Sequence, residues 1–330
     1  MDPEPFIRGR AFPGNNKVSY PRANPDDPYR LPVDTWAQAR IPVGVRLEFV
    51  GEAEALEVHY VTRTAELGYR GDGAGREFDL WHEGGRRARV EAQLGEGRAR
   101  FALSELGAGR FLVYLPEGMQ PTILAIEVHG GSIEPASPQP RWVVYGDSVA
   151  EGWVASGPAM AWPAVVGREV GLDTLNMGYA GAARGEIVSA EHIAELQADI
   201  ISISHGTNCW TRTPHSVGMF REGLIGFLDV VRQGHPDTPI VVVSPVTRPD
   251  AETTTNRLGA TLTDLRAAME SVVLDRIHAD PNLRLIPGRD LIDGSMLPDG
   301  LHPNDEGHAA IAAAIGPVLA EVVGVARGAA

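Results

Sequence analysis

The chain has 330 residues, of which 43% are hydrophobic and 22% are charged. This composition is close to the globular average, so it excludes wholesale disorder and fibrous classes, and the length leaves room for two domains of ordinary size. The formal net charge of −14 repels phosphate backbones and anionic lipid surfaces. We therefore expect neither nucleic acid nor a membrane as a partner.

Two further features concern the membrane and the compartment. No stretch approaches the roughly 18 consecutive apolar residues of a membrane helix, and the start MDPEPFIRGR lacks the basic end and apolar core of a signal peptide. Cys209 is the sole cysteine, which excludes an internal disulfide and any all-cysteine metal site and fits a reducing compartment. We expect a cytoplasmic protein.

The N-terminal half has the pattern of an antiparallel β-sandwich. Residues 1–34 are rich in Pro, Asn, Asp and Arg without periodicity, which predicts an extended surface segment that adds little to a core. From Trp36 onward, apolar and polar residues alternate in short runs separated by Gly-rich turns, which predicts a jelly-roll-like sandwich over 35–134. The runs are centred on Leu47, Val58, Asp79, Ala102, Tyr114 and Ile126.

A proline-rich stretch separates this half from the rest. The segment EPASPQP at 134–140 disfavours both helix and ladder hydrogen bonds, so we place a linker at 135–141. Beyond it, short apolar runs alternate with amphipathic stretches, which predicts an α/β domain with a mostly parallel sheet over 142–330. Strands are expected at 142–145, 174–177, 199–204, 239–244 and 283–286, and the clearest helices at 217–233, 258–278 and 304–323.

Polar residues and glycines follow three of these strands. The tripeptide GDS (146–148) comes after the first, GYAGAARG (178–185) after the second, and GTN (206–208) after the third. Near the C-terminus, PDGLHPN contains Asp299 three residues before His302. Because ligands of an open parallel sheet bind at the carboxyl ends of its strands, we expect these segments to meet.

The residue types suit acyl transfer through a serine. A serine hydroxyl attacks a carbonyl at neutral pH when an imidazole takes its proton and an acceptor holds the other ring nitrogen. Ser148, His302 and Asp299 supply these three groups. Backbone amides in a glycine loop and an asparagine amide would stabilise the oxyanion that forms. The GxSxG pattern of ordinary α/β-hydrolases is absent, since position 150 is Ala.

The four segments, in this order, resemble those of the SGNH (GDSL) family of serine ester hydrolases. The resemblance covers about 142–323 and implies that family's flavodoxin-like three-layer fold. It implies that Ser148 is the nucleophile, that His302 is its general base and that Asp299 orients the base. The oxyanion donors that it implies are the Ser148 amide, Gly181 and Asn208.

The surroundings of the site are less defined. Many relatives have Asp after the asparagine of GxN, where this chain has Cys209 and Trp210, which leaves the shape of the acyl pocket open. Asp147, His205 and Trp210 are candidate pocket residues. Asp147 is expected to support the serine turn, and His205 is as consistent with a packed side chain as with a catalytic one.

The two-part layout resembles that of family-two carbohydrate esterases and of a salicylyl acyltransferase of tetracycline biosynthesis. Both imply an acyl-enzyme on Ser148, which water resolves in a hydrolase and a bound alcohol resolves in a transferase. We expect a carboxylic ester hydrolase for a small or sugar-like ester, with no cofactor and no metal. The alternative is an acyltransferase that moves an acyl group from a small-molecule donor onto a hydroxyl of a polyketide-like metabolite.

Each motif also has a purely structural interpretation. Ser148 and Glu151 have the spacing of a helix capping box, Asp299 and Gly300 form a common turn dipeptide, and Asn208 is a candidate helix cap. These interpretations need no catalysis.

The sequence also contains candidate residues for a metal site and for a sugar-binding surface. His302, Asp305 and His308 cluster in the sequence, but no HExxH motif is present and the spacing of the two histidines does not place them on one helix face. A sugar-binding module with an inactive hydrolase domain would need exposed aromatic side chains on the sandwich. The candidates are Trp81, Tyr60 and Tyr69.

Overall fold

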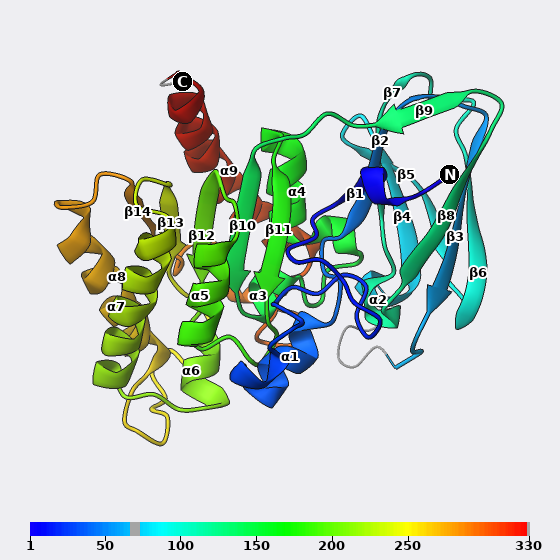
Figure 1. The fold of residues 1–330 in the computed structure, drawn as a ribbon. Coiled ribbons are helices and arrows are strands. Elements are labelled where there is room, and N and C mark those ends of the chain that lie inside the picture. Colours follow the sequence, from blue (N-terminus) through cyan, green and yellow to red (C-terminus); the bar gives the residue numbers. More distant parts are fainter. Residues whose placement is uncertain (67–72, 329–330) are drawn as a thin grey trace.

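The alternating runs of the N-terminal half form two packed antiparallel sheets in the computed structural model, which describes residues 1–66 and 73–328 (Figure 1). The strands are β1 (Ile7–Arg8), β2 (Arg46–Glu52), β3 (Ala55–Thr62), β4 (Glu77–His82), β5 (Gly85–Glu91), β6 (Gly95–Ala102), β7 (Gly109–Tyr114), β8 (Thr122–His129) and β9 (Ser132–Pro135). One sheet has the order β1-β2-β7-β4-β5 with β9 beside β2, and the other β6-β3-β8. Phe49, Val58 and Phe111 belong to the core between them, so the expected sandwich is confirmed.

The N-terminal segment lies between the two halves of the molecule and contributes to both cores (Figure 1). Phe6 and Tyr20 are buried in the sandwich core, and Phe12 and Leu31 in the core of the α/β half. The expectation of a surface segment over 1–34 is wrong, because a lack of periodicity excludes regular elements and not burial. The segment contains η1 (Glu4–Phe6) and η2 (Pro28–Arg30) and leads into α1 (Val33–Ala39).

Five parallel strands form the sheet of the C-terminal half. They are β10 (Arg141–Gly146), β11 (Asp173–Gly178), β12 (Ile200–Ser204), β13 (Ile240–Val243) and β14 (Leu283–Ile286). Their order is β11-β10-β12-β13-β14, and every neighbouring pair is parallel. All five expected strands are confirmed. This is the flavodoxin-like order, whose ligand crevice opens beyond the carboxyl ends of β10 and β12.

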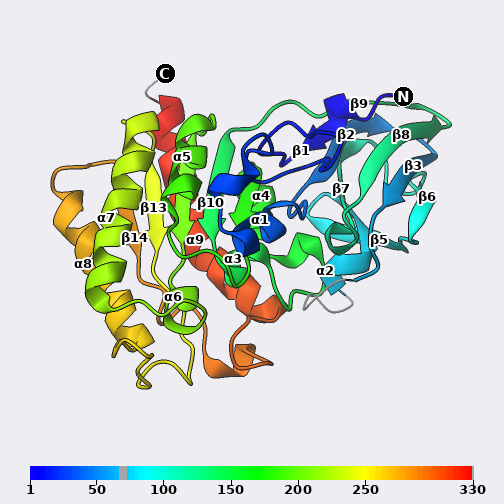
Figure 2. The same ribbon diagram turned by 60° about the horizontal axis from the view of Figure 1, so that its bottom comes forward.

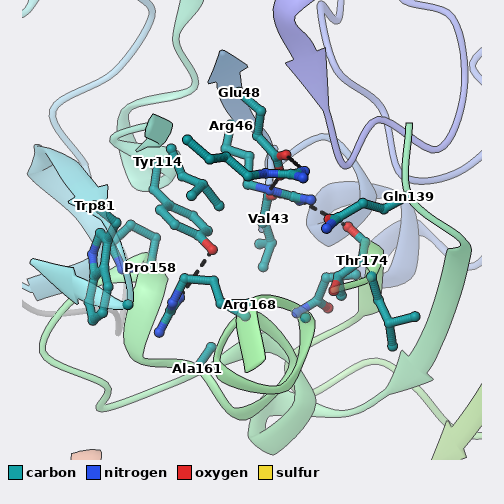
Figure 3. A pocket seen from close by; sticks show the side chains of 18 of the residues that line it. Val43, Arg46, Glu48, Trp81, Tyr114, Gln139, Pro158, Ala161, Arg168 and Thr174 are labelled. Atoms are coloured by element: carbon teal, nitrogen blue, oxygen red, sulfur yellow. Dashed lines mark hydrogen bonds and ion pairs between the residues drawn. The ribbon is translucent and has the colours of Figure 1, made fainter. Parts of the chain in front are cut away.

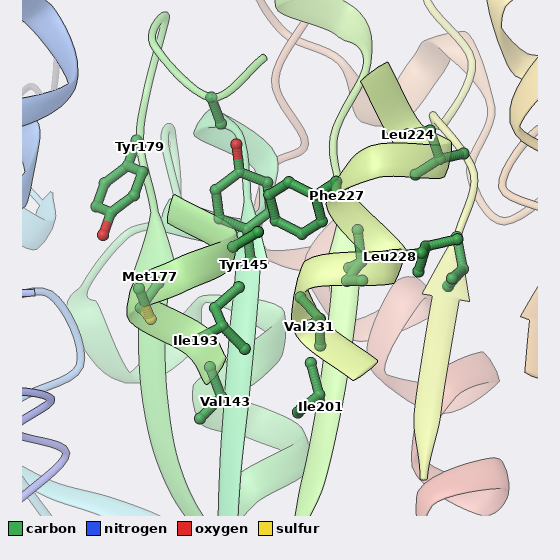
Figure 4. Close-up of a cluster of buried hydrophobic side chains, with 14 of the residues drawn as sticks. Val143, Tyr145, Met177, Tyr179, Ile193, Ile201, Leu224, Phe227, Leu228 and Val231 are labelled. Atoms are coloured by element: carbon green, nitrogen blue, oxygen red, sulfur yellow. The ribbon is translucent and has the colours of Figure 1, made fainter. Parts of the chain in front are cut away.

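Helices cover both faces of this sheet (Figures 1 and 2). Val143 and Tyr145 point into a core shared with one set of helices (Figure 4), whereas Trp142 and Val144 point into the opposite core. The first core is covered by α5 (Ile187–Glu195), α7 (Val217–Gly234) and α8 (Leu262–Ile277), and the second by α4 (Trp162–Val170) and α9 (Asp305–Gly328). The shorter helices are α2 (Gly73–Arg76), η4 (Glu117–Met119), α3 (Ser148–Glu151), η5 (Pro158–Met160), α6 (Thr207–Thr211) and η6 (Gly294–Met296).

Two helices differ from expectation. The start expected at residue 258 is wrong, because α8 begins at Leu262 after a capping box in which Thr261 and Asp264 bond to each other's backbone N–H.

The span Asp305–Gly324 of α9 is long and apolar enough to cross a membrane by length and composition, contrary to the sequence expectation. Half of that span is buried in the described structure, and a buried core helix passes the same test.

The edge strand β11 is covered by two arginines from the N-terminal half. Arg46 donates to the Thr174 carbonyl at 3.3 Å, and Arg22 donates to the carbonyls of Asn176 at 3.3 Å and of Gly178. These three carbonyls lie on alternate residues, so they point to the same side of the strand. An uncovered edge would be a template for pairing with another chain, and here the sandwich and the N-terminal segment satisfy it.

A cavity of about 150 Å³ lies where the sandwich meets α4 (Figure 3). The Arg168 guanidinium lies 3.9 Å from the centroid of the Trp81 ring and donates to Tyr114 Oη at 3.0 Å. Beside it, Glu48 forms ion pairs with both Arg46 and Arg110. The residues that line the cavity come from both halves and include none of GDS, GTN or PDGLHPN. It is therefore distinct from the site described next.

Candidate active site

The four segments meet at the carboxyl ends of β10, β11 and β12, where α3 and α6 begin (Figure 2). Gly146 is required at the end of β10, because a Cβ there would lie 2.4 Å from the Ser204 carbonyl oxygen. Asp147 is the N-cap of α3, and its Oδ1 accepts the Val149 N–H at 3.0 Å. Ser148 is therefore the first helical residue, with its hydroxyl available for another partner.

The capping-box interpretation of Ser148 and Glu151 is wrong. Glu151 Oε2 accepts a hydrogen bond from the N–H of Ala180 at 2.6 Å, and Ala180 lies in the loop after β11 and not in α3. Ser148 Oγ bonds to His302 Nε2 at 2.9 Å. Both side chains are engaged by residues distant in sequence, which a local helix cap does not require.

A hydroxyl, an imidazole and a carboxylate form a continuous chain. His302 Nε2 lies 2.9 Å from Ser148 Oγ, and His302 Nδ1 lies 2.6 Å from Asp299 Oδ2. Ser148 and His302 are 5% and 7% exposed, whereas the Asp299 side chain is 45% exposed, so the carboxylate end of the chain faces solvent. The geometry is that of a serine hydrolase triad.

The local turn fixes the direction of the Asp299 carboxylate. Asp299 Oδ1 accepts the N–H groups of Leu301 at 2.9 Å and His302 at 2.7 Å, which leaves Oδ2 facing the ring. Burial alone would raise the pKa of Asp299, but the hydrogen bonds from His302 and Leu301 hold it below its usual value. An ionised carboxylate only accepts, so Nδ1 carries the proton and Nε2 is free to accept the Ser148 proton.

Three donors lie in the segments that meet at Ser148. Among the described residues, no hydrogen bond is found for the backbone N–H of Ser148 or of Gly181. Gly181 has φ +68°, a left-handed conformation that favours glycine. Asn208 donates one amide hydrogen to the Ala183 carbonyl at 3.1 Å, which leaves the second for a ligand. Free donors of this kind suit an oxyanion.

The loop that carries Gly181 is braced by the N-terminal segment. Arg22 is 1% exposed and donates to the carbonyls of Gln38 at 2.7 Å and Ile41 at 2.6 Å as well as to those at the end of β11. Its guanidinium also lies 3.7 Å from Glu151 Oε2, the same oxygen that holds Ala180. A chain of contacts thus runs from residue 22 through α3 to the residue before Gly181. No motif in the aperiodic segment signalled this role.

The candidate pocket residues separate into different environments. His205 packs against Tyr145, Phe220 and Phe227 with ring centroids 5.5, 5.7 and 5.9 Å away, in the core drawn in Figure 4. Burial lowers the pKa of His205 to about 3, so it is a neutral core side chain. Trp210 is half-buried, and its Nε1 donates to the Thr254 carbonyl at 2.9 Å. None of these contacts of His205 and Trp210 is with Ser148, His302 or Asp299.

Other side chains near the triad have defined partners. The Trp153 ring lies 5.2 Å from the His302 ring and forms one wall beside the base. Asp305 accepts from the Ser156 N–H at 2.7 Å, and His308 Nδ1 accepts from the Trp162 N–H at 3.3 Å. The cluster of His302, Asp305 and His308 in the sequence is therefore not a ligand set in space.

Asp147 ties together the two helices that carry Ser148 and Asn208. It accepts hydrogen bonds from Val149 in α3 and from Thr207 in α6. Burial raises the pKa of Asp147 from 3.8 to about 6, against these hydrogen bonds and the nearby His302. This buried carboxyl supports the serine turn, as the sequence predicted.

The raised pKa of Asp147 predicts a specific pH dependence of stability. Between pH 4 and pH 6, approximately, the native state binds the proton more tightly than the unfolded chain, so ionisation on raising the pH destabilises the fold. A pKa raised from 3.8 to about 6 corresponds to about 3 kcal/mol. The side-chain amide of the Asp147→Asn variant cannot ionise, so the variant does not lose stability in this way. The free energy of unfolding of the variant minus that of wild type should therefore rise by about 3 kcal/mol between about pH 4 and pH 6. Urea unfolding at several pH values measures it, and a constant difference would contradict it.

Asn208→Ala tests the side-chain oxyanion donor. We expect kcat to fall by about 100-fold to 1000-fold with little change in KM, because the interaction is made mainly in the transition state. Steady-state kinetics with p-nitrophenyl acetate measures the loss, and the melting temperature shows whether the fold persists. Asn16→Ala, at an exposed position, is the matched control. A fall of less than about tenfold would remove Asn208 from the donor set.

The fold and the site together define a serine-dependent acyl-ester enzyme with an α/β catalytic domain. The model of the GDSL-like lipase/acylhydrolase family matches residues 139–320, which is more than half of the chain. The chain belongs to this family. No curated protein matches it.

Solved structures with both parts of the layout are similar to this chain. The salicylyl-acyltransferase SsfX3 from a tetracycline biosynthetic pathway has a TM-score of 0.81 at 25% identity, with 96% of this chain and 94% of that one covered. A family-two carbohydrate esterase from Clostridium thermocellum has a TM-score of 0.65 at 15% identity, covering 85% and 92%. The acetyl xylan esterase Est2A from Butyrivibrio proteoclasticus has 0.63 at 12%, covering 97% and 96%. The similarity to the last two structures, at 15% and 12% identity, shows a shared fold alone.

Proposed function

We propose that the protein is a carboxylic ester hydrolase that acts through an acyl-enzyme on Ser148 and takes a small or sugar-like ester. One observation carries the proposal: the continuous chain from Ser148 Oγ through the His302 ring to Asp299, at 2.9 and 2.6 Å. The membership in the GDSL-like lipase/acylhydrolase family supports the same class of reaction.

The proposed reaction proceeds in two steps. Ser148 Oγ attacks the ester carbonyl while His302 Nε2 takes its proton, and the carbonyl oxygen becomes an anion facing the amides of Ser148, Gly181 and Asn208. Collapse of this intermediate breaks the ester bond, and His302 gives the proton to the departing alcohol. Water then attacks the acyl-enzyme by the same proton transfers, releasing the acid and restoring the Ser148 hydroxyl.

A fluorophosphonate probe tests the nucleophile. The probe should block turnover of p-nitrophenyl acetate, and peptide mass spectrometry should place one adduct on Ser148. Label on another residue, or an active sample that takes no label, would contradict the assignment.

Acyl transfer to an alcohol is the second candidate, favoured by the similarity of the whole chain to a salicylyl-acyltransferase at a TM-score of 0.81. The two reactions share every step up to the acyl-enzyme and differ in what attacks it. Incubation with an activated acyl donor and candidate alcohols separates them by the ratio of free acid to acylated alcohol. Predominant free acid at saturating alcohol supports hydrolysis, and predominant acylated alcohol supports transfer.

Sugar binding by an inactive enzyme has little structural support. Trp81 and Tyr60 are 8% and 2% exposed, so neither offers the exposed ring that stacks on a sugar. Tyr69 lies outside the described residues. The complete triad geometry also favours an active enzyme.

A further inference from the structure

A guanidinium faces the glycine of the oxyanion loop. The Nε, Cζ and Nη2 atoms of Arg212 are 3.5, 3.6 and 3.6 Å from the point that a Cβ would occupy at Gly181. Three atoms of one planar group at nearly equal distances mean that the plane faces the glycine. A Cβ at these distances would make ordinary van der Waals contacts with the guanidinium, so it is the left-handed backbone that favours glycine at position 181.

The helix α6 places this guanidinium beside the second proposed oxyanion donor. The N–H of Arg212 donates to the Asn208 carbonyl at 3.0 Å, which is the helical bond between residues four apart. Residues at this spacing lie on one face of a helix. Arg212 therefore lies on the same face of α6 as Asn208, and its guanidinium faces Gly181. Asn208 and Gly181 are the two proposed oxyanion donors that lie outside α3.

The charge on Arg212 is not neutralised by the part of the chain that the structure describes. Its side chain is exposed, and no hydrogen bond or ion pair joins it to any residue of 1–66 or 73–328. The neighbouring arginines differ, since Arg184 pairs with Asp34 at 2.8 Å and Arg248 with Asp250 at 2.8 Å. In a chain of net charge −14, an unpaired cation at this point is a local attraction for anions.

We propose that Arg212 is a substrate-binding residue and that the preferred ester carries a carboxylate, which Arg212 binds while Ser148 attacks the carbonyl. This inference rests on the proposed ester chemistry and specifies its substrate class. The planar fork of guanidinium donors matches the two oxygens of a carboxylate. The contact exists in the bound ester and in the transition state alike, so it acts mainly through KM.

Pairs of esters that differ in one charge test the proposal. The acyl side is tested with p-nitrophenyl hexanoate against the mono-p-nitrophenyl ester of adipic acid, and the alcohol side with p-acetoxybenzamide against p-acetoxybenzoate. One of the two pairs carries its carboxylate on the side of the ester bond that faces Arg212. For that pair, Arg212→Gln should lower kcat/KM for the acidic ester about 10-fold to 100-fold and leave kcat/KM for the neutral ester within about twofold. Arg212→Lys should retain part of the preference, and added salt should reduce it in the wild type.

Arg221→Gln is the matched control. Arg221 is a partly exposed arginine of α7 that pairs with Asp275, so its replacement changes the net charge equally without altering Arg212. It should leave both esters of each pair unchanged.

Four outcomes are distinguishable. A selective loss on an acidic ester in Arg212→Gln supports the proposal. An equal loss on acidic and neutral esters would overturn it, because Arg212 would then act on the oxyanion common to both, and no loss on either would overturn it as well. If wild type turns over none of the four esters and Ser148 takes no fluorophosphonate label, the proposed ester chemistry itself fails.

Discussion

Ser148→Ala should abolish ester turnover and leave the fold unchanged. Without the hydroxyl no acyl-enzyme forms, and loss of a serine nucleophile lowers kcat by about 10⁴-fold to 10⁶-fold in enzymes with such a triad. The Ser148 side chain makes one hydrogen bond, to His302, and is nearly buried, so its removal leaves no cavity larger than one oxygen atom. Activity with p-nitrophenyl acetate and the melting temperature measure the two parts of the prediction.

A matched serine strengthens this test. Ser204 ends β12 one strand away, and its side chain can be removed while its carbonyl continues to accept the Asp147 N–H at 3.2 Å. Ser204→Ala should retain activity and fluorophosphonate labelling. An active Ser148→Ala protein, with the substitution verified by mass, would show that another nucleophile operates.

Arg22→Met should have the largest effect on stability. The substitution leaves the carbonyls that Arg22 caps on β11 and in the α1 turn without their donor, and it leaves the Glu151 carboxylate without its cationic neighbour. Removing one partner of a buried charged pair costs about 3 to 5 kcal/mol. Because Glu151 also holds Ala180, we expect kcat to fall as well, at temperatures where the variant remains folded.

The control for this variant is another arginine of the same region. Arg40→Met makes the same change in charge at an exposed position near the end of α1, and it should alter the free energy of unfolding by less than about 0.5 kcal/mol. Urea unfolding measures both variants. If Arg22→Met is as stable as Arg40→Met, the N-terminal segment does not brace the sheet edge and the oxyanion loop.

The strands and the triad residues were predictable because their signals are local. Burial on both faces gives β10 and β13 continuous apolar runs, and a strand of four to six residues needs no distant information to be recognised. Asp299 and His302 are three residues apart in one turn, so their 2.6 Å contact is encoded within a single short motif. The boundaries of helices were less certain where a cap competes with an apolar pattern, as at Thr261.

The hydrogen-bond partners of individual polar side chains were not predictable in the same way. Ser148 and Glu151 fit a helix cap by spacing, and their partners His302 and Ala180 lie 154 and 29 residues away. Likewise, nothing near Arg22 in the sequence indicates that Gly178, 156 residues later, needs a donor for its carbonyl. A side chain with several available partners is assigned to one of them only when the whole chain is packed.

The order of residues along the chain therefore specified the two halves, the parallel sheet and the Asp299–His302 contact, since each depends on periodicity or on spacing within a few residues. Packing between distant segments decided the burial of the N-terminal segment, the brace on the oxyanion loop and the position of the Arg212 guanidinium opposite Gly181. These features depend on which segments meet in space, and contacts across more than 100 residues leave no pattern in a single sequence.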